Sequence, residues 1–301
     1  MSLFDRALSA LLPAVPKPLV RHFSSRYIAG ERMEDAFRVV RSILDEGGMS
    51  TLDILGEFIH SREEAASNTR AYETLIRRIS EEKLPRTNVS VKLTALGLLL
   101  DRGLCLDNMR RLVATARAED DFIRIDMEDS VCTTPTLEIY EALRAESPGR
   151  VGVVLQSRLR RTLRDAERLG GTNTNVRLCK GIYLEPRTIA YTHPELIRRN
   201  FVLVLDHLLE KGAYVGIATH DEILVWEALR LVRKHALTPE LYEFQMLLGV
   251  DEPLRRILLA EGHRLRVYVP FGEHWYPYSV RRLRENPQIA GRAFRAMFRR
   301  A

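Results

Sequence analysis

Near the end of the chain, two adjacent arginines lie in a segment whose spacing places them beside an aromatic ring and a carboxylate. Tyr278, Arg281, Arg282 and Glu285 stand at positions i, i+3, i+4 and i+7 of a helical pattern, which puts all four side chains on one helix face. Each guanidinium can donate two parallel hydrogen bonds, so the pair is suited to a carboxylate or a phosphate. The alternative is a solvated surface pair, since arginine is seldom buried.

Two other charged residues interrupt apolar runs, where a charge is costly unless it is paired or functional. Lys92 lies in VSVKLTAL and Asp126 lies in IRIDME. They could form one satisfied ion pair with a purely structural role. They could equally line a binding site, and the elements that carry them decide between the two.

Those elements form a regular alternation of short apolar runs and helical segments, with no change of composition that would mark a linker. The eight runs with a β pattern are 49–56, 89–97, 122–129, 151–157, 176–181, 213–220, 242–249 and 265–272. Such an alternation predicts parallel strands joined by crossover helices. Eight units favour an α/β fold of the closed (βα)8 TIM type. No Gly-rich dinucleotide fingerprint follows a strand, which counts against an open doubly wound sheet.

We expect three parts: an N-terminal helical segment (1–48), the (βα)8 barrel catalytic domain (49–290) and a basic C-terminal tail (291–301). The double-arginine segment would form a final helix over the barrel mouth. The tail alternates arginines with phenylalanine and methionine, so it could rest on an anionic membrane surface. The alternative is a terminal helix that packs its apolar face on the barrel.

In a barrel of this type, the chemistry lies at the C-terminal ends of the strands. The polar side chains expected there are Lys92, Asp126, Gln156, Arg177, Lys180, Thr219, His220, Gln245 and Tyr268. Three of these are cations, and the two arginines of the final helix would add two more. Asp126 and Glu285 are the obvious counter-charges, so the excess predicts one or two anionic ligands, such as a phosphate-containing cofactor and a carboxylate substrate. His220 could act as a base or only as a hydrogen-bonding residue.

Composition and missing motifs narrow the class of protein. The chain has 301 residues, of which 46% are hydrophobic and 29% charged, as in a soluble globular protein. A net charge of +6 favours anionic partners without choosing among them. The three cysteines form no CxxC, and no metal-ligand spacing, P-loop or GxSxG occurs. No apolar run approaches the ~20 residues of a membrane span. We therefore expect a cytoplasmic protein without a metal.

Eight segments taken in order resemble the proline dehydrogenases, flavin-dependent enzymes of proline catabolism. They are LDILGE, VSVKLTALG, IRIDME, VVLQS, VRLCKGIY, GIATHDE, YEFQMLLG and YVPFGEHWYPYSVRRLREN. The resemblance covers about residues 49–290 and implies a stand-alone bacterial-type enzyme. It implies oxidation of L-proline to Δ1-pyrroline-5-carboxylate, by hydride transfer from C5 to N5 of FAD. Electrons would then pass to a membrane quinone, with the protein peripheral at the inner face of the membrane and without a nucleic-acid partner.

The resemblance also implies a role for each matching residue. Lys92, Arg281 and Arg282 would hold the substrate carboxylate, and the proline ring would be walled by Tyr268, Tyr278 and Leu247. The residues expected to take part in or adjoin the reaction are Lys92, Asp126 and Arg177, with Arg177 near flavin N5. The residues that would bind or adjoin FAD are Gln156, Arg177, Lys180, Gly181, Tyr183, Thr219, His220, Gln245 and Glu285, of which Glu285 would also support the arginine helix.

The sequence departs from the family pattern in two places. Ile182 stands where the family often has a small residue, and the segment around Glu128 and Asp129 is more acidic than expected. Two other classes of function stay open from the residues. One is a (βα)8 lyase or isomerase of a phosphorylated substrate that uses Lys92 as a Schiff-base amine. The other is a basic module that binds nucleic acid, although no such motif occurs.

Overall fold

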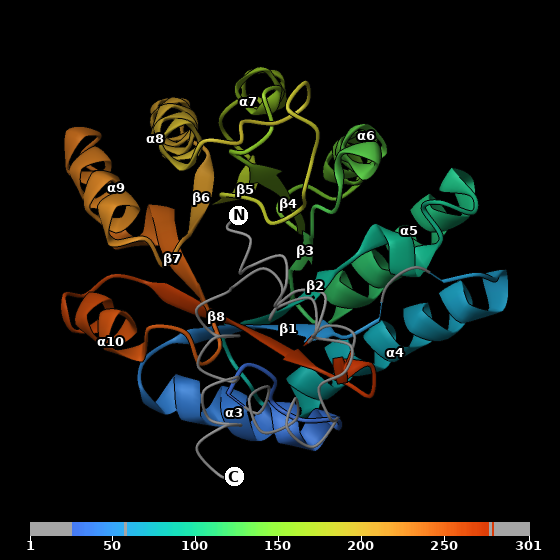
Figure 1. Cartoon of the computed structure of the whole chain (residues 1–301). Coiled ribbons are helices and arrows are strands. Elements are labelled where there is room, and N and C mark those ends of the chain that lie inside the picture. The colour runs from blue at the N-terminus through green and yellow to red at the C-terminus, as the bar shows by residue number, and fades with distance from the viewer. Residues whose placement is uncertain (1–25, 57–58, 277–278, 280–301) are drawn as a thin grey trace, which may run out of the picture.

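The structure, a computed structural model, describes residues 26–56, 59–276 and 279, and its centre is a closed parallel barrel. The strands are β1 Met49–Ile54, β2 Thr87–Val91, β3 Ile123–Ile125, β4 Val151–Gln156, β5 Asn175–Cys179, β6 Tyr214–Ala218, β7 Tyr242–Leu247 and β8 Leu265–Phe271. They pair in sequence order, and β8 closes the barrel on β1. Figure 1 shows the strands at the centre and the helices around them. The predicted (βα)8 barrel is confirmed.

Helices cover the outside of the barrel. They are α3 Met33–Asp45, α4 Arg62–Glu81, α5 Arg102–Ala118, α6 Ser130–Glu146, α7 Thr162–Leu169, α8 Pro194–Glu210, α9 Glu222–Lys234 and α10 Glu252–Ala260, with short 3-10 turns η2 Leu93–Leu96 and η3 Pro239–Leu241. Helix α3 packs on β1 and β8 and fills the place in the ring between α10 and α4 (Figure 1). The predicted final helix and basic tail, and the first part of the N-terminal segment, lie outside the described residues.

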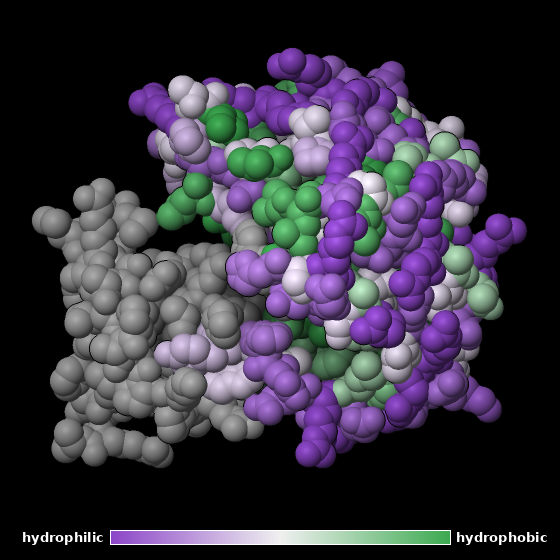
Figure 2. Space-filling model, turned by 90° about the vertical axis from the view of Figure 1, so that its right-hand side faces the viewer, coloured by the Kyte–Doolittle hydropathy of each residue, from purple (hydrophilic) through white to green (hydrophobic). Residues whose placement is uncertain are grey.

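Each helix turns an apolar stripe toward the strands, as its sequence spacing predicts. In α4, Tyr72, Leu75, Ile76 and Ile79 are buried while the opposite face is charged. Figure 2 shows the outer surface on the α4 and α5 side, where the helices present mostly hydrophilic residues to solvent. Among the described helices, none is both long enough and apolar enough to cross a membrane.

The side chains that face the barrel axis are polar. Strand side chains alternate between the helix layer and the barrel axis, so one strand can carry an apolar and a polar face. In β2, Val89 and Val91 are fully buried on the side that joins the hydrophobic core. Asn88 and Ser90 alternate with them and hydrogen-bond to residues of the neighbouring strands: Asn88 accepts from Thr51 on β1, and Ser90 donates to Asp126, just after β3. The same alternation predicts that the next residue of this series, at position 92, also faces the axis.

All eight strands end before the runs indicated by the sequence, and β2 and β3 fall short by the most. Strand β2 stops at Val91 because the chain turns at once into η2, which ends at Gly97 with a φ of 103°. Strand β3 stops at Ile125, and Asp129 then caps α6 by accepting a hydrogen bond from the Cys132 amide. The charged residues at positions 92 and 126 therefore follow their strands directly, at the C-terminal mouth.

Candidate active site

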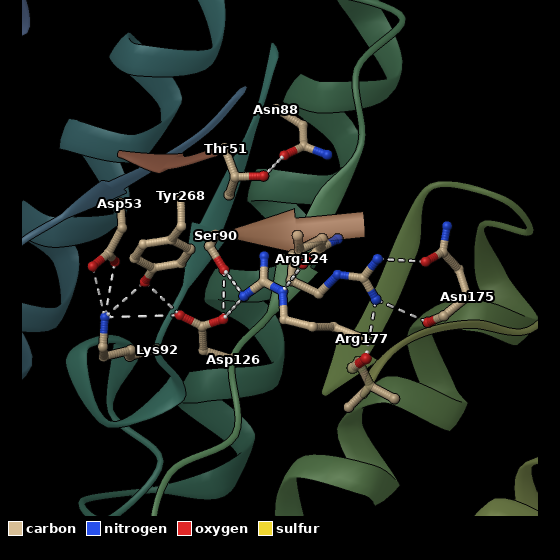
Figure 3. A network of polar contacts seen from close by, with 12 residues as sticks. Thr51, Asp53, Asn88, Ser90, Lys92, Arg124, Asp126, Asn175, Arg177 and Tyr268 are labelled. Atoms are coloured by element: carbon tan, nitrogen blue, oxygen red, sulfur yellow. Dashed lines mark hydrogen bonds and ion pairs between the residues drawn. The ribbon is translucent and has the colours of Figure 1, made fainter. Parts of the chain in front are cut away.

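Lys92 lies between two carboxylates at the C-terminal mouth of the barrel (Figure 3). Its Nζ is 2.9 and 2.8 Å from the two carboxylate oxygens of Asp53, near the end of β1. It is 3.8 Å from Oδ2 of Asp126 and 3.4 Å from the hydroxyl oxygen of Tyr268 on β8. The Asp53 side chain is fully buried, so this ion pair is shielded from water.

Asp126 joins Lys92 to a second cation. Its Oδ1 accepts hydrogen bonds from Arg177 Nη1 at 2.7 Å and from Ser90 Oγ at 2.6 Å, and its Oδ2 accepts one from the Tyr268 hydroxyl at 2.8 Å. The Arg177 guanidinium also lies 5.3 Å from the centre of the Tyr268 ring, within the range of a cation–π contact. One continuous network thus connects the ends of β1, β2, β3, β5 and β8.

The pKa values of the two carboxyl groups in this network, Asp126 and Asp53, are shifted in opposite directions. For Asp126, burial acts to raise the pKa, but the charges of Arg177 and Lys92 outweigh it and hold the pKa below its usual range. For Asp53, burial raises the pKa, and the nearby Asp126 charge adds to this effect against the attraction of Lys92. Asp126 is therefore the more firmly ionised of the two.

A chain of polar contacts orients Arg177 from its other side. Its Nε donates to Gln245 Oε1 at 2.5 Å, and Gln245 Nε2 donates to Glu243 Oε1 at 2.5 Å. Glu243 in turn pairs with Arg266 at 2.7 Å. Because Glu243 can only accept when ionised, it turns the amide oxygen of Gln245 toward Arg177. Gly216 leaves space for this side chain, since a Cβ there would lie 2.3 Å from Gln245 Nε2.

A second polar group lies at the ends of β5 and β6. Lys180 Nζ is 3.0 Å from Asp221 Oδ2, and Arg198 Nε from α8 is 2.7 Å from the same oxygen. Thr219 Oγ1 accepts a hydrogen bond from the Asp221 amide. His220 Nε2 accepts one from the amide of residue 247 at 3.0 Å. Two basic side chains thus share one carboxylate beside the strand ends.

The loop that follows β5 packs against the end of β4. Gly181 has a φ of 91°, and a Cβ at this position would lie 2.7 Å from Gln156 Oε1, so the backbone and the Gln156 amide are close. Gln156 Nε2 donates to the Glu128 carbonyl, and Arg158 donates to the Tyr183 carbonyl. Ile182, which departs from the family pattern, has a side chain that is 44% exposed, so its bulk is accommodated at the surface.

The acidic segment that also departs from the family pattern has a local explanation. Glu128 is buried and accepts hydrogen bonds from the backbone amide and the hydroxyl of Thr94 in η2. Asp129 caps α6. Both carboxylates therefore fix the connections that set the positions of Lys92 and Asp126.

The structure brings together five of the predicted site residues and leaves four outside its description. The five that meet are Lys92, Asp126, Arg177, Gln245 and Tyr268, and the four outside the described residues are Tyr278, Arg281, Arg282 and Glu285. The remaining predicted residues are on the same rim, at or just beyond the ends of β4, β5, β6 and β7, and they are Gln156, Lys180, Gly181, Tyr183, Thr219, His220 and Leu247.

The sequence interpretation missed three acids, of which Asp53 and Glu243 are buried and Asp221 is partly buried. Asp53, Asp221 and Glu243 each pair with a basic residue of the rim or the barrel axis. Acidic residues therefore neutralise more of the described positive charge at the rim than the sequence indicated. The signal was present, because Asp53 in LDIL and Glu243 in YEFQML also interrupt apolar strands.

The contacts of Lys92 oppose its use as a Schiff-base nucleophile. An amine with two carboxylate oxygens within 2.9 Å is held in its charged form, whereas attack on a carbonyl requires the neutral amine. Among the described residues, no group of histidine, cysteine, aspartate and glutamate side chains could hold a metal ion. Burial raises the pKa of Cys179 to about 11, so this thiol is not a ready nucleophile. The described part of the site thus consists of paired cations beside the aromatic ring of Tyr268.

A family model described as Proline dehydrogenase matches residues 36–294. The chain is 37% identical over 284 residues to Proline dehydrogenase of Deinococcus radiodurans, which covers 92% of this chain and 91% of that protein. It is 34% identical over 274 residues to Proline dehydrogenase 2 of Bacillus subtilis strain 168, which covers 91% of this chain and 90% of that protein.

The fold was compared with solved structures. The crystal structure of proline utilization A from Bdellovibrio bacteriovorus, inactivated by N-propargylglycine, matches with a TM-score of 0.83 at 25% identity. The match covers 92% of this chain but 36% of that longer chain. The likeness therefore extends over most of this chain.

Proposed function

The chain belongs to the proline dehydrogenase family, and we propose that it oxidises L-proline to Δ1-pyrroline-5-carboxylate, the first step of proline catabolism. One observation carries most weight: Lys92, Asp126 and Arg177 form an alternating buried row of charges under Tyr268 at the barrel mouth. Barrels of this type bind their substrates there. A small cyclic amino acid needs a cation for its carboxylate and an aromatic wall for its ring, and this row offers both.

Substrate binding would rest on Lys92 together with Arg281 and Arg282, which would hold the carboxylate. Tyr268, Tyr278 and Leu247 would wall the ring. The hydroxyl of Tyr268 is anchored to Asp126, so its ring can serve as a fixed surface. A ring of five atoms offers few contacts, so most of the affinity should come from the carboxylate, and a fixed geometry is what favours the reaction.

The rim also suits FAD. A dinucleotide needs basic side chains for its diphosphate and a backbone that approaches closely, and the rim offers Lys180 and the left-handed Gly181. Arg177 would lie near N5 of the flavin. Gln156, Tyr183, Thr219, His220 and Gln245 would complete the cofactor contacts, with Glu285 beyond the described residues. Bound FAD would supply the oxidant, taking hydride from C5 of proline at N5 and passing electrons to a membrane quinone. The protein would meet that quinone at the inner face of the membrane.

The amine of proline must be neutral for C5 to lose hydride easily, so the rate should rise with pH. We assign this proton to solvent, because the described carboxylates of the network are already bound to cations. Arg177 would stabilise negative charge next to it, while its contacts with Asp126 and Gln245 keep it in place.

The absorption spectrum of the purified protein tests this function. We expect a yellow protein with flavin bands that bleach when L-proline is added without oxygen. A colourless protein that borohydride links covalently to a keto substrate through Lys92 would contradict it and support the Schiff-base alternative. A short-chain quinone should restore the flavin bands after bleaching, and failure to do so would contradict the proposed electron acceptor alone.

A further inference from the structure

Asp53 is the closest described partner of Lys92 and is itself held firmly in place. Figure 3 shows Lys92 with Asp53 on one side and Asp126 on the other. Both carboxylate oxygens of Asp53 lie within 2.9 Å of Lys92 Nζ. From α4, the Tyr72 hydroxyl lies 3.3 Å from Asp53 Oδ1 and also accepts a hydrogen bond from the Ile54 amide. The Asp53 side chain thus has one fixed place behind Lys92.

Asp126 does not fill the same role for Lys92. Its Oδ1 accepts from Arg177 and Ser90, and its Oδ2 accepts from Tyr268. The distance from Lys92 Nζ to Asp126 Oδ2 is 3.8 Å, which is longer than a hydrogen bond. The short contacts that neutralise the buried ammonium among the described residues therefore come from Asp53. A buried ammonium that loses such a partner tends to lose its proton.

We propose that Asp53 is a positioning residue, which keeps Lys92 protonated and its ammonium fixed at the barrel mouth for an incoming carboxylate. This inference rests on the proposed function, in which Lys92 binds the substrate carboxylate. It assigns Asp53 no contact with the substrate, since the residue is fully buried behind the lysine.

The inference predicts a pH signature. The described groups that face Lys92 are Asp53 on β1, Asp126 after β3, Tyr268 on β8, Tyr72 on α4 behind Asp53, and Arg177 on β5 beyond Asp126. Replacing Asp53 by Asn keeps the shape and removes one negative charge. Without the negative charge of Asp53, the ammonium form of Lys92 is less stabilised. The pKa of Lys92 therefore falls, and the side chain loses its proton at a lower pH.

The test is the dissociation constant of 2-furoate, measured from the flavin absorbance of the holoenzyme between pH 6 and pH 9. This ligand is ionised throughout that range, so only the protein titrates. We expect a flat profile for the unaltered protein. In Asp53→Asn we expect similar affinity at pH 6 and a loss approaching about tenfold per pH unit at the alkaline end. Parallel profiles for the two proteins would overturn the inference.

Two controls separate positioning from general damage to the fold. Neutral 2-furamide should bind Asp53→Asn with no added pH dependence, and an equal loss for both ligands would overturn the inference. In a Lys92→Met background, Asp53→Asn should change furoate binding little, because the residue through which it acts is gone. A full Asp53→Asn effect in that background would also overturn it.

A second variant covers the case in which Asp53→Asn fails to bind flavin. Asp53→Glu keeps the charge but displaces it, so furoate should bind more weakly with the profile still flat. An alkaline loss in Asp53→Glu would overturn the inference. If Lys92→Met itself binds furoate as tightly as the unaltered protein does, the carboxylate-binding role of Lys92 in the proposed function fails instead.

Discussion

The Nη1 atom of Arg177 lies 2.7 Å from Oδ1 of Asp126. On the opposite side, Arg177 Nε donates to Gln245, so the planar guanidinium is held at two points. A cation fixed in this way needs no rearrangement when a charged ligand arrives or when charge develops beside it. The buried residues along the barrel axis thus hold Arg177 in a fixed position at the barrel mouth.

Replacing Arg177 by Met should lower kcat for proline oxidation by at least about tenfold, because a preorganised charge beside the reacting atoms is lost. Flavin content should be measured in the same samples and kcat expressed per bound flavin. Arg124→Met is the matched control, since Arg124 is also a buried strand arginine but its hydrogen bonds go to Val153 and Asn175 instead of to Asp126 and Gln245. A normal kcat in Arg177→Met would contradict its role.

Replacing Arg281 or Arg282 by Met should raise the KM for proline far more than it lowers flavin content. The loss of one carboxylate contact should cost on the order of 2–5 kcal/mol in kcat/KM. Arg70→Met is the control, because Arg70 is an exposed arginine on α4. Unchanged KM values in both test variants would remove the arginine pair from the substrate site.

Glu243→Gln should make the stability of the protein less sensitive to acid. Burial acts to raise the pKa of Glu243, but Arg266 outweighs it and lowers the pKa to about 2. A carboxyl with a lowered folded-state pKa stabilises the fold above its unfolded pKa of about 4.3, and this contribution disappears as pH falls toward 2. Urea titrations should show a deficit of about 3 kcal/mol at pH 7 that shrinks by pH 3. An equal deficit at both pH values would contradict this.

Asp121→Asn should stabilise the protein above neutral pH. Asp121 lines a cavity of about 540 Å³ at the N-terminal end of the barrel, and burial raises its pKa to about 7. A raised carboxyl pKa makes the folded state lose stability as pH rises from about 4 to about 7, and Asn cannot ionise. We expect a gain of about 2–4 kcal/mol at pH 8 and little change at pH 4. Asp120→Asn, at an exposed neighbour, should not reproduce this dependence.

The fold could be predicted from the sequence because the hydrophobic pattern of each segment indicates whether it forms a strand or a helix. Apolar runs separated by helical segments require parallel strands, and eight of them close a barrel without information from distant contacts. All eight strand ends were placed too late, most of all those of β2 and β3, which stop at Val91 and Ile125. The turn at η2 and the cap at Asp129 end these strands, and neither is visible in the apolar pattern.

The site could be predicted only in part. Position within a strand shows that Lys92, Asp126 and Arg177 reach the mouth, but not which acid meets which cation. Those pairings depend on the stagger between strands and on side-chain reach across the axis. Asp53 lies one strand away from Lys92 and was missed for this reason, although it interrupts an apolar run in the same way. The family resemblance supplied substrate and cofactor roles that no spacing contains.

In the proposed function, this site removes hydride from bound L-proline. The most direct measurement mixes the purified holoenzyme with L-proline in the absence of oxygen, follows flavin absorbance and traps the product with 2-aminobenzaldehyde. We predict one Δ1-pyrroline-5-carboxylate for each flavin bleached, and no bleaching with an equal amount of L-alanine, which lacks the ring. Flavin that stays oxidised in excess L-proline, or bleaches without forming this product, would contradict the account.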